Sequence, residues 1–358
     1  MRHRLRILWT LIVLGILVEP VPAEMDPLIL DDEPAFVLDL YGRVWPSLVT
    51  GELSWTIADV IGDESEEWIN TNPSSISLVS INNRRMVIHW EDRLADPWRH
   101  NRRAGAGACV DVDGDGARDI LRTRALGDTL VLDVISGEGE LLLSCAPLVP
   151  PAGDTLETWD VRLSGCGVIV NRQSGRRLII AAAARGPVAD PRAVIAYDAR
   201  TGEEMWRYST GPNPQSSTFE FIDLNHDGQE EILFTMESPD NPRFSGETSG
   251  RKAYLIALGV DGRSLWVSVL GAGFCHPIYH ALLWRNEKVW AVVTATSQHK
   301  PSLEEDEGPS VSLSIWEART GTLLSTIPSS ISFSGLVRTG PASVMAAQLD
   351  GTISVYKA

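Results

Sequence analysis

The chain consists largely of short apolar runs that alternate with polar turns, and helical periodicity is almost absent. The run Ala193–Asp198, AVIAYD, is too short for a typical helix and predicts a strand. Pairs of such runs flank a glycine-containing turn at residues 197–206, 258–266 and 316–324, and each pair predicts a hairpin. The pattern therefore predicts an all-β fold.

The strand pattern also repeats about every 52 to 60 residues, in units of roughly four short strands. Such repeats are typical of a β-propeller, in which each four-stranded sheet buries its faces against its neighbours. We predict a single β-propeller over residues 53–358, most simply of six blades, with seven as the alternative. Many of the 12 tryptophans are expected to pack between blades. The units begin near Leu53, Ala106, Thr158, Thr218, Ile278 and Ile331.

Closure of the predicted ring is open at this stage. The last unit supplies three strands before the chain stops, and propellers often take the missing strand from the other terminus. The N-terminal segment 24–52 holds a candidate for this role at residues 36–45, although that stretch has the pattern of a whole hairpin.

One strand connection carries acidic residues at regular spacing. Residues 111–119, DVDGDGARD, place aspartates at loop positions 1, 3, 5 and 9, with a glycine at position 6 and a backbone carbonyl at position 7. Oxygen ligands in this arrangement bind calcium at about 2.3 to 2.6 Å. Four carboxylates this close repel one another unless a cation neutralises them. The predicted ligands are Asp111, Asp113, Asp115, the carbonyl of Ala117, and Asp119.

A second connection, residues 223–231 with the sequence DLNHDGQEE, repeats this spacing. It has one carboxylate fewer, so we expect it to bind calcium more weakly. Both loops lie between predicted strands and lack the glutamate at position 12 of an EF-hand. The alternative for both is a polar turn without metal. The predicted ligands of the second site are Asp223, Asn225, Asp227, the carbonyl of Gln229, and Glu231.

A third copy of the loop, at residues 59–67, is altered at two positions. Ile61 occupies the ligand position 3, and Glu64 replaces the glycine at position 6. We expect little or no calcium binding there.

Blades that carry a loop of the form Asp-x-Asp-x-Asp-Gly-x-x-Asp/Glu between their first two strands resemble FG-GAP/VCBS repeats, as in integrin α chains and many bacterial secreted proteins. The resemblance covers residues 53–270, and the rest of the chain by period alone. It implies a calcium-binding propeller and little about activity, because propellers host many unrelated functions. The stretch 198–206, DARTGEEMW, also resembles the outer-strand repeat of pyrroloquinoline quinone-like propellers.

The first 23 residues have the pattern of a secretory signal peptide. Three arginines precede an apolar run at residues 7–18, which is too short to span a bilayer, and a small-residue cleavage site ends at Ala23. We therefore expect a secreted or periplasmic protein. The net charge of −16 argues against nucleic acid and anionic membranes as partners. A protein or polysaccharide in the cell envelope or outside the cell is the expected partner.

The four cysteines form no Cys-x-x-Cys pair, so they do not indicate zinc binding or redox chemistry. A disulfide between Cys145 and Cys166 and a set of buried free thiols are both compatible with their spacing.

Three long insertions separate the second and third predicted strands of consecutive units, at residues 185–192, 237–252 and 297–310. Equivalent connections of a propeller emerge on one face, so we expect them to cluster opposite the calcium loops and outside the blade core. They form a recognition surface in one interpretation and are merely tolerated insertions in the other.

Motifs for catalysis are weak. Pro277 separates His276 from His280, which argues against a helical zinc pair, and no Gly-x-Ser-x-Gly motif occurs. We therefore expect a calcium-stabilised, extracytoplasmic binding or scaffold module for protein or carbohydrate. The alternative is a carbohydrate-active propeller enzyme, a lyase or hydrolase. An acidic cluster in the central channel with a sugar-sized pocket would favour the enzyme.

Overall fold

The computed structural model describes residues 36–38, 44–46, 54–58, 60–61, 67–72, 75–82, 85–93, 105–150, 161–185, 192–215, 218–242, 244–300, 311–331, 333–348 and 352–357. The elements in these ranges are β-strands, apart from a single 3-10 residue at Thr218, which confirms the all-β prediction. The predicted signal peptide lies outside the described residues. Within them, no helix has the length and hydropathy needed to cross a membrane.

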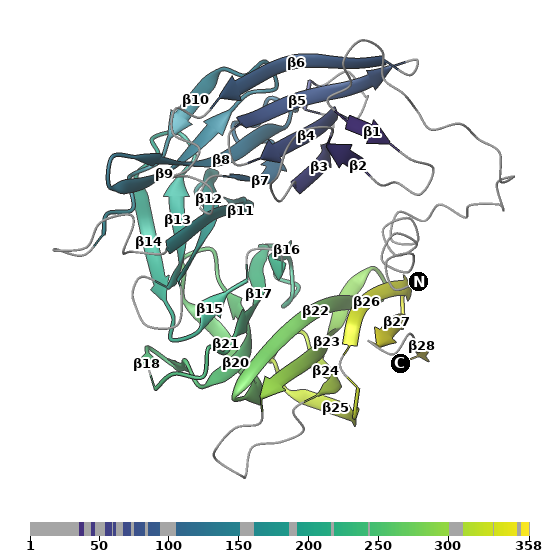
Figure 1. Cartoon of the computed structure of the whole chain (residues 1–358). Coiled ribbons are helices and arrows are strands. Elements are labelled where there is room, and N and C mark those ends of the chain that lie inside the picture. Colours follow the sequence, from purple (N-terminus) through teal and green to yellow (C-terminus); the bar gives the residue numbers. More distant parts are fainter. Residues whose placement is uncertain are drawn as a thin grey trace, which may run out of the picture.

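Consecutive strands form a series of antiparallel sheets around a central opening (Figure 1). The first sheet contains β3 (Ser54–Ala58), β4 (Glu67–Asn72), β5 (Ser75–Asn82) and β6 (Arg85–Arg93). The second contains β7 (Gly105–Val110), β8 (Asp119–Leu126), β9 (Thr129–Ile135) and β10 (Leu141–Ser144). The third contains β11 (Val161–Asn171), β12 (Arg176–Arg185), β13 (Ala193–Asp198) and β14 (Glu204–Ser209).

The fourth sheet differs in that two short strands, β15 (Asn213–Pro214) and β16 (Glu220–Ile222), both pair with β17 (Glu231–Glu237). It continues with β20 (Lys252–Leu258) and β21 (Ser264–Ala272). The fifth contains β22 (Phe274–Arg285), β23 (Lys288–Lys300), β24 (Ser312–Glu317) and β25 (Leu323–Pro328). The sixth contains β26 (Phe333–Gly340), β27 (Ser343–Gln348) and β28 (Ile353–Lys357).

The three hairpins predicted from the sequence are confirmed, as β13–β14, β20–β21 and β24–β25. The stretch proposed for ring closure is a hairpin of β1 (Phe36–Leu38) and β2 (Val44–Pro46). Among the described residues it forms a sheet of its own, separate from β26–β28. The closing strand therefore stays a prediction.

The sheets in the middle of the series are apolar on both faces, and neighbouring sheets bury those faces. Along β12, Ile179 packs with the second sheet and the adjacent Ile180 packs with the fourth, because successive side chains of a strand point to opposite faces. The same alternation on β17 sends Phe234 toward the third sheet and Leu233 toward the fifth. Fully burying one such side chain contributes about 1.5 to 3 kcal/mol. The core is therefore a series of layers between sheets.

Tryptophans of the outer strands join neighbouring sheets, as the sequence predicts. In each case the indole N–H donates to a carbonyl in the turn between the third and fourth strands of the next sheet. The pairs are Trp90 with Gly137 at 2.9 Å, Trp206 with Val260 at 3.0 Å, and Trp266 with Ala318 at 3.1 Å. Between the second and third sheets, the Ala146 N–H donates to the Gly202 carbonyl at 2.7 Å instead.

Glycine is required where an indole ring covers one of these turns. Gly262 has φ of 78°, and a Cβ atom built on it would lie 2.5 Å from the Trp206 ring. Gly321 has φ of 67°, and a Cβ atom built on it would lie 2.5 Å from the Trp266 ring. A side chain at either position would displace the ring and strain the backbone.

All four cysteines are free, and three of them are buried. The Cys145–Cys166 disulfide, one of two possibilities left open by the sequence, is therefore wrong. Burial raises the pKa of Cys109, Cys145 and Cys275 to about 12, so these thiols stay protonated at neutral pH. They serve as small core side chains.

The substitution Gly262→Ala tests the tryptophan contact. We expect it to lower the free energy of unfolding by about 2 to 4 kcal/mol, because strain at positive φ adds to the clash with Trp206. Gly175→Ala is the matched control, since Gly175 has φ of 68° and nothing within 4 Å of an added Cβ. It should lose only about 1 kcal/mol. Urea unfolding measures both, and equal losses would show that the ring does not constrain the turn.

Candidate functional site

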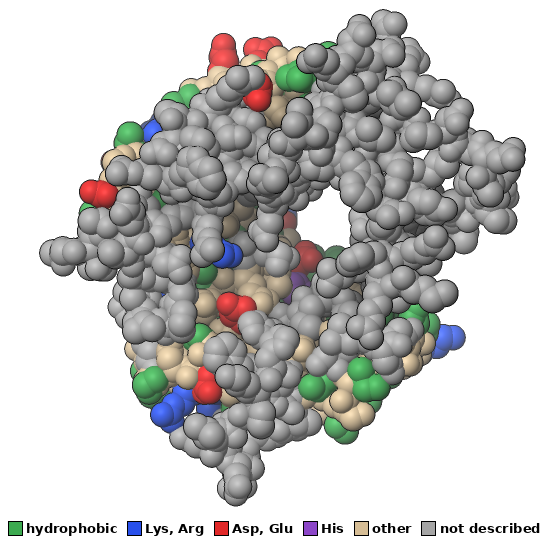
Figure 2. Space-filling model, viewed as in Figure 1, with side chains coloured by type: hydrophobic (Ala, Val, Ile, Leu, Met, Phe, Trp, Pro, Cys, Tyr) green, Lys and Arg blue, Asp and Glu red, His purple; other side chains and the backbone are tan. Residues whose placement is uncertain are grey.

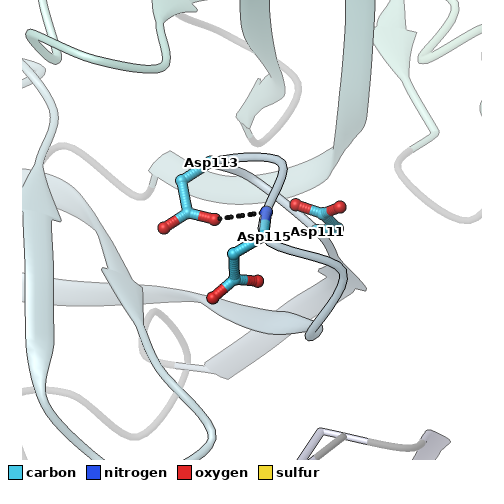
Figure 3. A group of neighbouring side chains, drawn as sticks. All are labelled: Asp111, Asp113 and Asp115. Atoms are coloured by element: carbon cyan, nitrogen blue, oxygen red, sulfur yellow. Dashed lines mark hydrogen bonds between the residues drawn. The ribbon is translucent and has the colours of Figure 1, made fainter.

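The two acidic loops connect the first and second strands of their sheets, as the sequence predicts. Residues 111–118 join β7 to β8, and residues 223–230 join β16 to β17. Strands on both sides exclude the two helices of an EF-hand. Figure 3 shows Asp111, Asp113 and Asp115 along the curve of the first loop.

Both loops are held by the same set of side chain to backbone hydrogen bonds. In the first loop, the Asp111 carboxylate accepts from the N–H groups of Gly114 and Gly116, and Asp113 accepts from Asp115 at 3.1 Å (Figure 3). In the second loop, Asp223 accepts from His226 at 2.6 Å and Gly228 at 3.0 Å, and Asn225 accepts from Asp227 at 2.8 Å. Two sequences with different residues thus fold into one loop geometry.

Position 7 of each loop extends this pattern. The N–H of Ala117 donates to Asp115 at 2.8 Å, and the N–H of Gln229 donates to Asp227 at 2.7 Å. The Gln229 side chain also reaches the third sheet, where its amide donates to the Val170 carbonyl at 2.8 Å. These contacts hold the backbone at the two residues whose carbonyls are the predicted ligands.

Three carboxylates converge in each loop, although the two sets differ. Ligand oxygens of Asp111, Asp113 and Asp115 lie within 4.8 Å of one another, and Asp119 is not part of that group. In the second loop the group is Asp223, Asp227 and Glu231. The sequence predicts four acidic ligands in the first loop and three in the second, whereas the structure brings three carboxylates together in each loop.

The acid at position 9 has a structural task that the sequence interpretation missed. Asp119 accepts from the N–H of Val112 at 2.9 Å, and Glu231 accepts from the N–H of Leu224 at 2.7 Å. Glu67, in the altered third copy, accepts from the N–H of Val60 at 2.8 Å. In all three loops, therefore, the carboxylate at position 9 accepts a hydrogen bond from the backbone N–H at position 2. The sequence offered one signal of this structural role, because the third loop has lost two other positions of the motif but keeps an acid at Glu67.

Two arginines of the third sheet lie against the acidic loops. The Arg177 guanidinium donates to the backbone carbonyl of Asp111 and lies 3.3 Å from its carboxylate. Arg172 follows β11, and its N–H donates to the Gln229 side chain at 2.8 Å. The first loop is therefore less negative in effect than its four aspartates indicate.

Without a cation, the acid at position 9 of each loop resists ionisation. Burial, followed by repulsion from the other aspartates of the loop, raises the pKa of Asp119 to about 6. The same two causes raise the pKa of Glu231 to about 7. The Val112 and Leu224 N–H groups oppose the shift without cancelling it. Each loop thus holds negative charge that a bound cation would stabilise.

One predicted insertion, residues 237–252, is described except for residue 243. It leaves the opposite end of β17 from the acidic loop, as predicted, and contains a hairpin of β18 (Phe244–Ser245) and β19 (Thr248–Ser249). The expectation that it lies outside the blade core is wrong for Thr248, Ser249 and Gly250, which are buried. The Gly211 N–H donates to the Thr248 hydroxyl at 2.9 Å, which ties the hairpin to the connection between sheets. The other two insertions lie almost wholly outside the described residues.

A pocket with a volume of about 810 Å³ lies between this hairpin and the outer strands of the fourth sheet. Phe244 at its rim is 74% exposed, and Leu265 and Val269 on β21 are also exposed. The Ser264 hydroxyl donates to Glu247 at 2.8 Å and links the hairpin to β21. Basic and apolar side chains gather on the surface over these elements (Figure 2). The lining of the pocket includes Arg251, Lys252, Tyr254 and Trp266.

No protein family matches the chain, and no curated protein matches it. Solved structures do match. The rhamnogalacturonan lyase YesW has 15% identity and a TM-score of 0.51, over 92% of this chain and 59% of the lyase. The Dos1 propeller has 10% identity and a TM-score of 0.52, over 90% of this chain and 71% of that one. The dihydro-heme d1 dehydrogenase NirN has 14% identity and a TM-score of 0.52, over 95% of this chain and 64% of that one.

These similarities show the fold, an all-β protein of the β-propeller type. The chain spans 59% of the lyase's length, and identities of 10% to 15% carry nothing about activity. The resemblance to FG-GAP/VCBS repeats therefore rests on the loop residues, and the resemblance to quinone propellers on one hairpin sequence.

The raised pKa values predict how stability depends on pH in the presence of a chelator. Asp119 holds its proton more tightly when folded, about 6 against 3.8, so stability is lost as pH rises through this range. Glu231 adds a loss between 4.5 and about 7. We expect the free energy of unfolding to fall by about 1 to 3 kcal/mol per group between pH 5 and pH 8.

Asp119→Asn should remove its share of this fall, because the carboxamide still accepts from Val112 and does not ionise. Urea unfolding at both pH values, with and without the substitution, measures the difference. A variant with the same slope as the unsubstituted protein would contradict the assignment to Asp119.

Proposed function

We propose that the protein is an extracytoplasmic, calcium-stabilised β-propeller that binds a protein or carbohydrate partner. The observation that carries the binding function is the pocket beside the β18–β19 hairpin, where exposed apolar side chains and charged groups surround a hollow. Buried contacts at Thr248 and Gly250 hold the hairpin in place, so the pocket is preorganised. A mere tolerated insertion needs none of these contacts.

Calcium is the cation that the loops fit best. The donors are oxygens only, from carboxylates and an amide, which hard cations prefer. Oxygens within 4.8 Å of one another can share one ion, because two calcium–oxygen bonds span at most about 5 Å. Asp111, Asp113, Asp115 and the carbonyl of Ala117 would hold the first ion, with Asp119 behind them. Asp223, Asn225, Asp227, the carbonyl of Gln229 and Glu231 would hold the second.

The remaining parts of the proposal follow from the sequence and the strand order. Six sheets in succession support a six-bladed ring, closed by a strand from the N-terminal segment. Residues 1–23 would direct the chain out of the cytoplasm. Outside the cell, calcium is abundant enough to occupy such loops. Loops of this form support assignment to the FG-GAP/VCBS group, and the partner would belong to the envelope or the extracellular space.

The enzyme alternative has less support from the geometry. Among the described residues, the groups of three or more His, Cys, Asp or Glu side chains able to share an ion are the two strand-connecting loops. The pocket lies on the outer strands of the fourth sheet. An acidic cluster inside the ring together with a sugar-sized pocket would have favoured a lyase or hydrolase.

Calcium removal should destabilise the protein. At a free calcium concentration about 100 times the dissociation constant, each site contributes roughly 2.7 kcal/mol, so a chelator should lower the melting temperature by several degrees. Calorimetry should resolve two binding events, of which Asp113→Ala removes one and Asp227→Ala the other. An unchanged melting temperature with no heat of calcium binding would refute the sites.

The order of the two affinities tests the charge argument. We expect the first loop to bind more tightly, and Asn225→Asp to tighten the second by adding a carboxylate. Arg177→Gln should strengthen the first site, because it removes the guanidinium beside Asp111. Binding constants that do not respond to either substitution would show that charge does not set affinity.

Recognition through the pocket should depend on its exposed rim. We expect Phe244→Ala combined with Leu265→Ser to weaken partner binding at least tenfold while leaving melting temperature and calcium uptake unchanged. Leu324→Ala is the matched control, because Leu324 is a half-exposed apolar residue on the outer strand of the fifth sheet. The measurement is binding of glycan arrays and envelope proteins to immobilised protein. Partner binding that survives the double substitution would move the search to the acidic loops.

A further inference from the structure

Alternate residues of β21 form the floor of the pocket beside the β18–β19 hairpin. Leu265, Val267 and Val269 all line the pocket, and Leu265 and Val269 are 47% and 46% exposed although they are apolar. Successive residues of a strand point to opposite faces, so these three side chains share one face and repeat about every 6.8 Å. An extended peptide that lies along β21 has the same repeat. The floor therefore matches such a peptide in period and in polarity.

The strand β21 is also the last strand of its sheet. In the described part of the chain it pairs with β20 alone. An antiparallel strand with one neighbour directs about half of its backbone N–H and C=O groups away from that neighbour. From Leu265 to Leu270, no other described residue makes a backbone-to-backbone hydrogen bond with this outer edge. The edge can therefore accept a further strand.

The β18–β19 hairpin gives this edge a fixed wall. The Ser249 N–H donates to the Tyr254 hydroxyl at 2.9 Å, and the Ser264 hydroxyl donates to Glu247 at 2.8 Å. These two bonds attach the hairpin to both β20 and β21. Phe244 lies at the rim and is 74% exposed. A peptide beside β21 would bury this ring against its own apolar side chains, which favours binding.

The charged side chains of the pocket favour an acidic segment. Arg251 and Lys252 both line the pocket, whereas its one carboxylate, Glu247, already accepts the hydrogen bond from Ser264. The lining is therefore basic in a chain whose net charge is −16. The other surface charges repel an acidic peptide from a distance. At 0.15 M salt, however, the Debye length is about 8 Å, so the charges that line the pocket decide what binds there.

A sugar chain fits this lining less well than a peptide does. Sugar hydroxyls lose hydrogen bonds to water on binding and need polar partners in return. The aliphatic floor of Leu265, Val267 and Val269 supplies none, but it can cover apolar side chains of a peptide.

We infer that the pocket takes an extended, acidic segment of a partner protein, which pairs with the outer edge of β21 as an added strand. Apolar side chains at alternate positions of the segment would cover Leu265, Val269 and Phe244, and an acidic side chain would lie beside Arg251 and Lys252. This assignment rests on the proposed function, in which the pocket is the binding site, and it narrows the partner to a protein.

Selection of short random peptides from a displayed library, with the full chain as bait, supplies the probe. We expect the selected peptides to share apolar residues at alternate positions and at least one aspartate or glutamate. Changing that acid to its amide in the synthetic peptide should weaken binding about tenfold, as measured by fluorescence anisotropy. Arg251→Gln combined with Lys252→Gln should abolish the difference between acid and amide. Arg263→Gln is the matched control and should preserve it, because Arg263 is 88% exposed before β21 and outside the pocket lining.

Methylation of single backbone nitrogens in the peptide tests the strand pairing without altering the protein. Alternate N–H groups of an added strand face β21. We therefore expect binding to fall about tenfold when every second position is methylated and to change little at the positions between them. Losses without this alternation would contradict strand addition.

A selection that yields no binding peptide also overturns the inference. The proposed function is kept in that case if glycans or proteins still bind and lose affinity in Phe244→Ala combined with Leu265→Ser. If selected peptides bind this double variant as tightly as the unsubstituted protein, the pocket is not their site, and both proposals fail.

Discussion

The burial of sheet faces against neighbouring sheets is the constraint on which the rest of the structure depends. The strand β12 is apolar from Leu178 to Ala183, and its buried side chains alternate between one inter-sheet layer and the next. No sheet can bury its own surface, so each is stable only between two others. The loops at the ends of the strands contribute less to this burial, through single residues such as Val112 and Leu224. Most of their positions can therefore take acidic residues, glycines and insertions.

The acidic loops show how little sequence is needed to fix a loop shape. Their aspartates and Asn225 satisfy backbone N–H groups within the loop, and the acid at position 9 fastens position 2. The carboxylates are thus gathered by hydrogen bonds before any cation arrives, and the pKa values of Asp119 and Glu231 are raised as a result of burial and of repulsion from the other loop acids. Arg177 offsets part of the repulsion in the first loop from outside it. The same carboxylate oxygens can therefore hold the turn between two strands and bind a cation.

Much of the fold could be predicted because its signals are local. Strand alternation, glycine turns such as that at Gly262, and the spacing of Asp111 to Asp119 act over a few residues, so one sequence suffices to recognise them. Contacts between sheets are different. Arg177 beside Asp111, Glu220 beside His280, and the seating of Thr248 against Gly211 join residues far apart in sequence, and no local pattern encodes them.

The tryptophan contacts give the chain a direction of assembly. Each indole binds a turn that follows it by a similar stretch of chain, 47, 54 or 52 residues later, in the next sheet. Loop-closure entropy is therefore nearly equal at every junction, and no junction requires a distant part of the chain. Because synthesis delivers the N-terminal sheets first, each completed sheet presents its indole to the next turn as that turn emerges. Growth by successive docking keeps the contact order of each step low.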